Sequence, residues 1–392
     1  MHKTFYLSNF IFTPHSAAIP FQRVGFGTTP LEKAVDLHTL RTVTTDPRER
    51  GRIVGRRYRP QVRRVGGLYL DHFATLGLEA ARVRAIAERS HARLRAWHPG
   101  LAAESDACAD AAGIDRWVVA AVGARTEVLA AAPPAPEGEC STAVFAPTTG
   151  APETLQTWDW HDALAPVGLL HRLTPARGRT VKLFTEFGVP GKIGVNSSGL
   201  GVHFNILSHE SDDDSGGVPV HAVARRVLDE ADTVEDAVRI AGSARVSAST
   251  SLTVLAGARG GRARAVSLEL SPAGMAIARA GADGWLLHTN HFLDEGLHTG
   301  DTMPADSTTA ERFSHLQEIR ETMSGRSPAD RAKAFCGPAG AQAAVCMRPD
   351  PDKPLHEQWG TLLTIGLDTD ACALDYLAGD PDLAARNGFA QF

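Results

Sequence analysis

The 392-residue chain lacks several features that would place it in a special class of protein. It has no apolar run near the roughly 18–20 residues that a membrane helix needs, and it contains no Cys-x-x-Cys pair and no His-Glu-x-x-His. The apolar start of the chain is interrupted by Ser8, Asn9, Pro14 and His15, a pattern unlike a secretory leader. We therefore expect no membrane contact, no metal site and a reduced, cytoplasmic setting. The cysteines that remain number five: Cys108, Cys140, Cys336, Cys346 and Cys372.

The composition is that of an ordinary globular protein, with 43% apolar and 22% charged residues. The net charge is −5, but it is unevenly distributed. Residues 1–139 carry 19 Lys and Arg against 14 Asp and Glu, whereas residues 140–392 carry 21 against 31. Arginines gather between Arg48 and Arg64 with few aromatics among them, so we predict a solvated helix face there and no nucleic-acid partner.

The chain divides into three parts by pattern. Residues 1–38 show no periodicity and are predicted to be an N-terminal extension. Helical periodicity follows in residues 78–97 and 114–130, so residues 39–139 are predicted to be mainly helical. Residues 131–138 contain three prolines and a glycine, which fit neither a helix nor a central strand, and this predicted linker ends just before Cys140.

Residues 140–392 have a different character. Helices are predicted from Pro219 to Glu230 and from Thr233 to Gly242, the second with Asp236 in a capping box. Strands are predicted at 181–187, 192–206 (interrupted by a turn), 252–256, 263–270, 275–280, 285–289, 361–367 and 371–377. The four strands from 252 to 289 read as one meander. Strand clusters around a helical pair predict an α+β fold of two sheets with helices packed outside.

Three short segments contain residue types suited to acyl chemistry. They are Cys140-Ser141-Thr142, Thr157-Trp158-Asp159 and His288-Thr289-Asn290-His291. Spacing alone does not make them a site, because a single cysteine is more often buried and inert than catalytic.

Taken in order, these segments resemble the isopenicillin N acyltransferase family, whose members act on acyl-coenzyme A and 6-aminopenicillanic acid or hydrolyse related amides. The family belongs to the N-terminal nucleophile hydrolases. The resemblance extends over about residues 40–378 and includes further matches, namely Arg50-Gly51, Arg125-Thr126-Glu127, Lys192-Ile193-Gly194-Val195-Asn196-Ser197-Ser198-Gly199, Gly217-Val218-Pro219 and Glu269-Leu270-Ser271-Pro272. It implies a four-layer αββα sandwich of two antiparallel sheets between helices.

The resemblance also implies a mechanism. The chain would be an inactive precursor that cuts itself between Glu139 and Cys140 through a thioester, leaving a small subunit and a large subunit that begins with Cys140. The α-amine of Cys140 would then act as the base for its own thiol, since such amines have a pKa of about 7.7–8.0.

The remaining site residues also follow from the resemblance. Asn290 would donate to the oxyanion, and Asp159 would orient the amine or a water. Thr142, on the same strand face as Cys140, would hold the precursor geometry. Substrate contacts are expected from Trp158, Ser141 and His288. No cofactor is expected, although a coenzyme A thioester is one candidate acyl donor; the partners would be an acyl donor and an amine or amide.

The chain departs from the family pattern at three places. Glu139 stands where a small residue is usual, and its carboxylate would either slow self-cleavage or accept a proton. Thr157 replaces an asparagine. An arginine expected before Gly360-Thr361-Leu362 is missing, which argues against a penicillin-like carboxylate substrate. Two alternatives stay open: a hydrolase with no transferase activity, and an inactive homologue that binds a small molecule and stays uncut.

Overall fold

The computed structural model describes residues 36–132, 139–164, 167–257, 262–304, 307–354 and 357–392. The predicted N-terminal extension lies outside these ranges except for residues 36–38. Residues 133–138 of the predicted linker also lie outside them.

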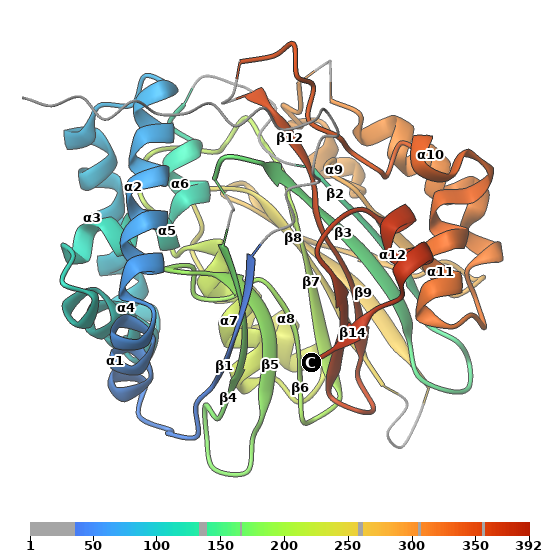
Figure 1. Ribbon diagram of the computed structural model, residues 1–392, viewed down its shortest axis with the longest axis horizontal. Coiled ribbons are helices and arrows are strands. Elements are labelled where there is room, and N and C mark those ends of the chain that lie inside the picture. The colour runs from blue at the N-terminus through green and yellow to red at the C-terminus, as the bar shows by residue number, and fades with distance from the viewer. Residues whose placement is uncertain (1–35, 133–138, 165–166, 258–261, 305–306, 355–356) are drawn as a thin grey trace, which may run out of the picture. The chain divides into compact units, whose positions relative to one another are not determined.

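The described strands form two sheets (Figure 1). The first sheet has eight strands, which in spatial order are β1 (Asp36–Arg41), β4 (Val167–Leu173), β5 (Val181–Glu186), β6 (Ile193–Asn196), β7 (Leu200–Ile206), β8 (Thr250–Ala256), β9 (Arg264–Ser271) and β10 (Gly274–Arg279). The second has six, which in spatial order are β11 (Trp285–His288), β2 (Cys140–Phe145), β3 (Glu153–His161), β12 (Trp359–Asp368), β13 (Ala373–Leu377) and β14 (Ala390–Gln391).

Helices cover the outer faces of both sheets. On the side of the eight-stranded sheet lie α1 (Pro47–Arg57), α2 (Arg59–Thr75), α3 (Ala80–Trp97), α4 (Pro99–Ala112), α5 (Arg116–Gly123), α6 (Arg125–Leu129), α7 (Val220–Glu230) and α8 (Val234–Gly242). On the side of the six-stranded sheet lie α10 (Thr309–Ile319), η1 (Arg320–Thr322), α11 (Pro328–Cys336), η2 (Gly337–Gln342) and α12 (Pro381–Asn387). The short α9 (Glu295–His298) follows β11.

Two apolar cores correspond to these layers. The larger core lies between the sheets and continues into the helices beside the eight-stranded sheet; it includes Val144, Trp158 and Val202. The smaller core joins the outer face of the six-stranded sheet to α10 and α11, for example through Ala143, Leu287 and Phe335. Because side chains alternate along a strand, Val144 and its neighbour Ala143 face different cores. The predicted α+β fold with four αββα layers is confirmed.

Two details of the predicted sheets are wrong. The sheets are antiparallel except for β1, which pairs with β4 in parallel. The predicted four-strand meander holds only for β8, β9 and β10, because the fourth strand, β11, crosses to the other sheet and pairs with β2. Adjacent strands usually pair, but β11 buries its apolar residues against α10 and α11, where the other sheet offers an open edge.

Several predicted elements follow from local chemistry. Thr233 and Asp236 form the capping box that begins α8, as predicted. The helix predicted for residues 114–130 divides at Ala124 into α5 and α6. The arginine-rich stretch forms α1 and the start of α2, but Arg50 is 3% exposed and pairs with Glu104 at 2.8 Å, so the predicted solvated face is wrong for this residue.

The close packing of α1 on α4 requires a glycine. A Cβ atom on Gly51 would lie 2.1 Å from the carbonyl oxygen of Glu104. No helix within the described ranges combines the length and apolar character of a membrane span.

Candidate active site around Cys140

Cys140 begins β2 and sits opposite Trp158 on β3. The pairing continues one residue upstream, where the Asp159 N–H donates to the Glu139 carbonyl (2.8 Å) and the Glu139 N–H donates to the Asp159 carbonyl (3.2 Å). The Glu139–Cys140 peptide bond is therefore held within the sheet. Glu139 and Cys140 are 1% and 4% exposed, so the bond is buried in the uncut chain.

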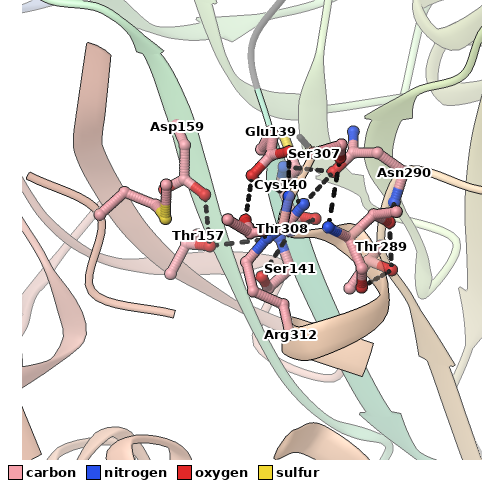
Figure 2. Close-up of polar contacts among 12 residues, drawn as sticks. Glu139, Cys140, Ser141, Thr157, Asp159, Thr289, Asn290, Ser307, Thr308 and Arg312 are labelled. Carbon is pink, nitrogen blue, oxygen red and sulfur yellow. Dashed lines mark hydrogen bonds and ion pairs between the residues drawn. The ribbon is translucent and has the colours of Figure 1, made fainter. Parts of the chain in front are cut away.

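Side chains from three other segments hold the backbone of Cys140 (Figure 2). Its N–H donates to Oδ1 of Asn290 at 2.8 Å. Its carbonyl accepts from Nη1 of Arg312 at 2.8 Å and from Nδ2 of Asn205 at 3.1 Å. These contacts fix the amide nitrogen that would become the α-amine after cleavage.

Asn290 is positioned by contacts on every polar atom of its side chain. Its backbone N–H donates to Thr309 Oγ1 (2.8 Å), and its Nδ2 donates to the Ile206 carbonyl (2.8 Å). Its Oδ1 accepts from Arg312 Nη2 (3.0 Å) as well as from the Cys140 N–H. Because the Ile206 carbonyl can only accept and the Cys140 N–H can only donate, the side-chain amide of Asn290 fits in only one of its two orientations. In the uncut chain Asn290 thus holds the amide nitrogen through its oxygen, and its N–H group is engaged with Ile206.

The side chain of Glu139 occupies a polar pocket at the start of α10. Oε1 accepts from Ser307 Oγ (2.6 Å) and from the Thr308 N–H (3.0 Å). Oε2 accepts from Thr308 Oγ1 and lies 3.1 Å from Arg312 Nη2, a guanidinium with no exposed surface. Figure 2 shows these groups close around Cys140. The first turn of α10 adds the positive end of its helix dipole.

Thr142 is connected to the Cys140 carbonyl through Asn205, a residue of the facing sheet. Its hydroxyl donates to Oδ1 of Asn205 on β7 at 2.8 Å, and Asn205 in turn holds the Cys140 carbonyl. The two sheets are thereby linked at the predicted nucleophile.

Asp159 is buried beside the site, with its carboxylate toward Thr157 (Figure 2). Its Oδ1 accepts from Thr361 Oγ1 at 2.6 Å, and its Oδ2 lies 3.5 Å from Thr157 Oγ1. Burial raises the pKa of Asp159 to about 7, against the opposing effects of Arg312 and the Thr361 hydroxyl. The carboxyl group therefore changes charge near neutral pH.

Burial raises the pKa of the Cys140 thiol to about 12 in the uncut chain, and the nearby Asp159 raises it further. The cations of Lys192 and Arg312 act in the opposite direction. At neutral pH the thiol is consequently protonated, and it needs a base before it can attack a carbonyl.

A buried charged cluster connects residues 1–139 to this site. Lys192 Nζ lies 3.6 Å from the ring centroid of Trp158 and 3.0 Å from Glu186, which also pairs with Arg125 and accepts from the Tyr69 hydroxyl at 2.8 Å. Burial lowers the pKa of Lys192 to about 7, with Arg125 acting in the same direction. Since α2 and α6 supply Tyr69 and Arg125, the cluster joins the two predicted subunits.

Of the remaining predicted site residues, Ser141 adjoins the groups around Cys140, whereas His288 makes its contacts elsewhere. Ser141 accepts from Arg312 Nη1 at 3.0 Å, so it adjoins the site. His288 has no exposed surface, and its ring nitrogens lie 2.8 Å from Glu269 Oε1 and 2.8 Å from the Thr289 carbonyl. In this arrangement neither ring nitrogen of His288 points into a cavity.

A cavity of about 250 Å³ lies at the end of β7, one strand residue of which, Ile206, also contacts Asn290. The residues around it include Ile206, whose carbonyl binds Asn290, together with Thr126 and Leu129 from the first 139 residues. Asp212 also lines it, and burial raises the pKa of this carboxyl to about 6. Both predicted subunits contribute to the cavity, which is large enough for part of a small substrate.

Four residues of the site were not found from the sequence, namely Asn205, Ser307, Thr308 and Arg312. They come from a strand and a helix start far from Cys140 in the chain, and no spacing rule marks them. The sequence lacks the family's arginine before Gly360, and it therefore provides no reason to expect a cation at the site. Arg312 supplies a buried cation there. Among the described residues, no group of three or more His, Cys, Asp or Glu is arranged to hold a metal ion.

Comparison with known proteins gives a family match over much of the chain. The model of the family described as acyl-coenzyme A:6-aminopenicillanic acid acyl-transferase matches residues 155–382, a range that begins downstream of Cys140. The 40 kDa form of acyl-coenzyme A:6-aminopenicillanic-acid-acyltransferase of Emericella nidulans is 30% identical over 188 residues, which are 47% of this chain and 50% of that protein. The chain thus spans about half the length of this curated relative.

The matching solved structures are more distant in sequence. Penicillin V acylase from Agrobacterium tumefaciens is 15% identical, with 62% of this chain and 76% of that chain covered and a TM-score of 0.36. A mutant of conjugated bile acid hydrolase from Clostridium perfringens is 13% identical, with 64% and 92% covered and a TM-score of 0.39. With TM-scores below 0.5, the description of the fold rests on the sheets and helices themselves.

Proposed function

The chain belongs to the acyl-coenzyme A:6-aminopenicillanic acid acyl-transferase family, and from this premise we propose that it is an enzyme that cuts itself between Glu139 and Cys140. The new N-terminal cysteine then transfers an acyl group to an amine or hydrolyses an amide. The observation that carries this proposal is that hydrogen bonds hold both the carbonyl and the nitrogen of the Glu139–Cys140 peptide bond. The Asp159 N–H holds its carbonyl and Asn290 Oδ1 holds its nitrogen, each at 2.8 Å.

Self-cleavage begins with attack of the Cys140 sulfur on the Glu139 carbonyl carbon. The thiol proton passes to the amide nitrogen, the C–N bond breaks, and a thioester joins Glu139 to the sulfur. Negative charge that develops on the carbonyl oxygen meets the Asp159 N–H, which already donates to it. Water then hydrolyses the thioester, and the products are a carboxyl terminus at Glu139 and a thiol beside a new α-amine.

In the cut enzyme the new α-amine serves as the base for the buried thiol. Its ordinary pKa of about 7.7–8.0 leaves part of it neutral near pH 7. Asn290 Oδ1 is placed to keep holding this nitrogen, and the nearby Arg312 favours its neutral form. The proposed roles are therefore Cys140 as nucleophile, Asn290 as the residue that orients the amine, and the Asp159 N–H as an oxyanion donor.

The other predicted roles take their support from different contacts. Thr142 holds the Cys140 carbonyl through Asn205 and so positions the precursor. The side-chain N–H of Asn290 becomes a second oxyanion donor if it exchanges Ile206 for substrate. The Asp159 carboxyl, with its pKa near 7, is suited to accept a proton during self-cleavage.

The substrate is an amide or thioester whose acyl group reaches the sulfur, followed by water or an amine. The cavity lined by Ile206 is proposed to hold part of the substrate, because the Ile206 carbonyl accepts from Asn290, which in turn holds the nitrogen of the cleaved bond. A coenzyme A thioester remains a candidate acyl donor. Incubating the cut enzyme with an acyl thioester, with and without an amine, separates transfer from hydrolysis.

Mass spectrometry and N-terminal sequencing of the purified protein test self-cleavage. We expect two chains, the larger beginning Cys-Ser-Thr-Ala, and a single intact chain for Cys140→Ala. Cys372→Gly is the matched control, because Cys372 has a φ of 51°, which glycine adopts readily. It should be cut like the parent. An intact 41.7 kDa parent chain would instead support the alternative of an uncut homologue that only binds a small molecule.

A further inference from the structure

The pocket around the Glu139 carboxylate is a fully formed anion site next to the reacting sulfur. Ser307 and Thr308 provide two hydroxyls and one backbone N–H, and Arg312 provides a guanidinium. Arg312 has no exposed surface, so its charge cannot be balanced by solvent.

Glu139 is itself the first acyl group that this enzyme handles. During self-cleavage its carbonyl is bound to the Cys140 sulfur while its side chain is anchored in the pocket. A substrate that acylates the same sulfur places its own acyl chain beside the same groups. The residue before the cut is therefore a template for the acyl group of the substrate.

We assume that Glu139 leaves the pocket after cleavage, which would leave Arg312 without its counter-charge. Among the described residues, Glu139 is the carboxylate within ion-pair distance of Arg312. Removing one partner of a buried ion pair is strongly unfavourable, because the remaining charge stays out of water. An incoming acyl group that ends in a carboxylate restores the pair, and a neutral acyl group does not.

We propose that the enzyme prefers acyl groups in which three carbons separate a carboxylate from the reacting carbonyl carbon, that is, glutaryl and α-glutamyl groups. The length is that of Glu139, in which Cα, Cβ and Cγ separate the two carbonyl carbons. The α-glutamyl form gains one more contact, since the Glu139 N–H donates to the Asp159 carbonyl at 3.2 Å. This inference rests on the proposed self-cleavage and names the substrate class of the same site.

The reaction is balanced without any further reagent. The sulfur forms a bond to the glutaryl carbonyl carbon, the amide C–N bond breaks, and the amine leaves with the thiol proton. Water then hydrolyses the thioester to glutarate and thiol. With an amine in place of water, the glutaryl group is transferred.

The test uses the purified, self-cleaved enzyme and a set of p-nitroanilides. Succinyl, glutaryl and adipoyl groups vary the length of the acyl chain. Pentanoyl and glutaramyl groups keep the length of glutaryl but remove its charge. We expect kcat/KM to peak at glutaryl and to exceed that of pentanoyl by about 100-fold or more, because a site built of polar groups rejects a ligand that leaves them unpaired.

The variants Ser307→Ala and Thr308→Val examine the pocket directly. Each removes a hydroxyl that contacts the Glu139 carboxylate, so each should lower the ratio of glutaryl to pentanoyl turnover by about 10-fold. Ser327→Ala, at the start of α11, is the matched control for loss of a serine at a helix start and should leave the ratio unchanged.

The outcomes separate this inference from the proposed function. An uncut chain overturns both. A cut enzyme that uses pentanoyl as well as glutaryl amides overturns only the inference. If the cut enzyme uses none of the anilides, calorimetry decides: tighter binding of glutarate than of pentanoate supports the inference, and equal binding or none overturns it.

Discussion

Replacing Glu139 by Gln tests the energetics of the buried pair in the uncut chain. The change should be made in a Cys140→Ala background, so that the chain stays whole. Gln keeps the oxygen that accepts from Ser307 and the Thr308 N–H, but it presents N–H groups to Arg312 in place of a carboxylate. Arg312 then lies fully buried beside a neutral donor.

The expected cost is a loss of about 3–5 kcal/mol in the free energy of unfolding, the range for breaking a buried ion pair from one side. Urea denaturation followed by tryptophan fluorescence measures it. The matched control is Glu49→Gln, whose carboxylate pairs with Arg52 at 3.0 Å; the side chains of Arg52 and Glu49 are 36% and 42% exposed. Exposed pairs contribute about 0–1 kcal/mol, so this control should change stability little.

A double variant refines the measurement. Combining Glu139→Gln with Arg312→Met removes the uncompensated charge but also the donors to Cys140, Ser141 and Asn290, so part of the lost stability should return. The reasoning is refuted if Glu139→Gln costs no more than the control.

Three further predictions concern the site and the helix that supports it. Asn290→Ala should slow self-cleavage by about 100-fold or more, as followed by gel electrophoresis, because the cleaved nitrogen loses its anchor; cleavage at the parental rate would contradict this. Gly51→Ala should destabilise the chain by about 1–3 kcal/mol in thermal unfolding, since the new Cβ meets the Glu104 carbonyl, and an unchanged midpoint would show that α1 moves freely. Burial raises the pKa of Asp159 to about 7, so its contribution to stability is full below its unfolded pKa and is lost as the pH rises through 7. We therefore compare the free energies of unfolding of Asp159→Asn and its parent, both in a Cys140→Ala background, by urea denaturation. The variant should be more stable relative to the parent at pH 8 than at pH 5, and the opposite trend would contradict burial as the cause of the raised pKa.

Much of the local structure was predictable because it depends on neighbouring residues. The capping box of α8 needs only Thr233 and Asp236, three residues apart, and the predicted hairpin at 361–377 appears as β12 and β13. Periodicity does not reveal which sheet a strand joins, which is why β11 was placed in the wrong one. That choice depends on the helices α10 and α11, against which its apolar residues are buried.

The candidate site divides in the same way. Its central residues, Cys140 and Asn290, stand in short motifs and were found by resemblance. Their partners Asn205 and Arg312 stand in no motif, and they reach Cys140 from positions 65 and 172 residues away in the chain.

By itself the sequence determined the α+β class of the fold and the ends of many elements, while the peptide bond at which cleavage is proposed came from the family resemblance of its motifs. Fold class and element ends depend on residue type and short spacing, which any stretch of chain carries with it. Only the tertiary structure decided that Asn290 holds the Cys140 nitrogen through its oxygen, and that a buried arginine faces the Glu139 carboxylate. Such contacts arise from the packing of two sheets and a helix, and they exist only once distant segments have been brought within hydrogen-bond distance.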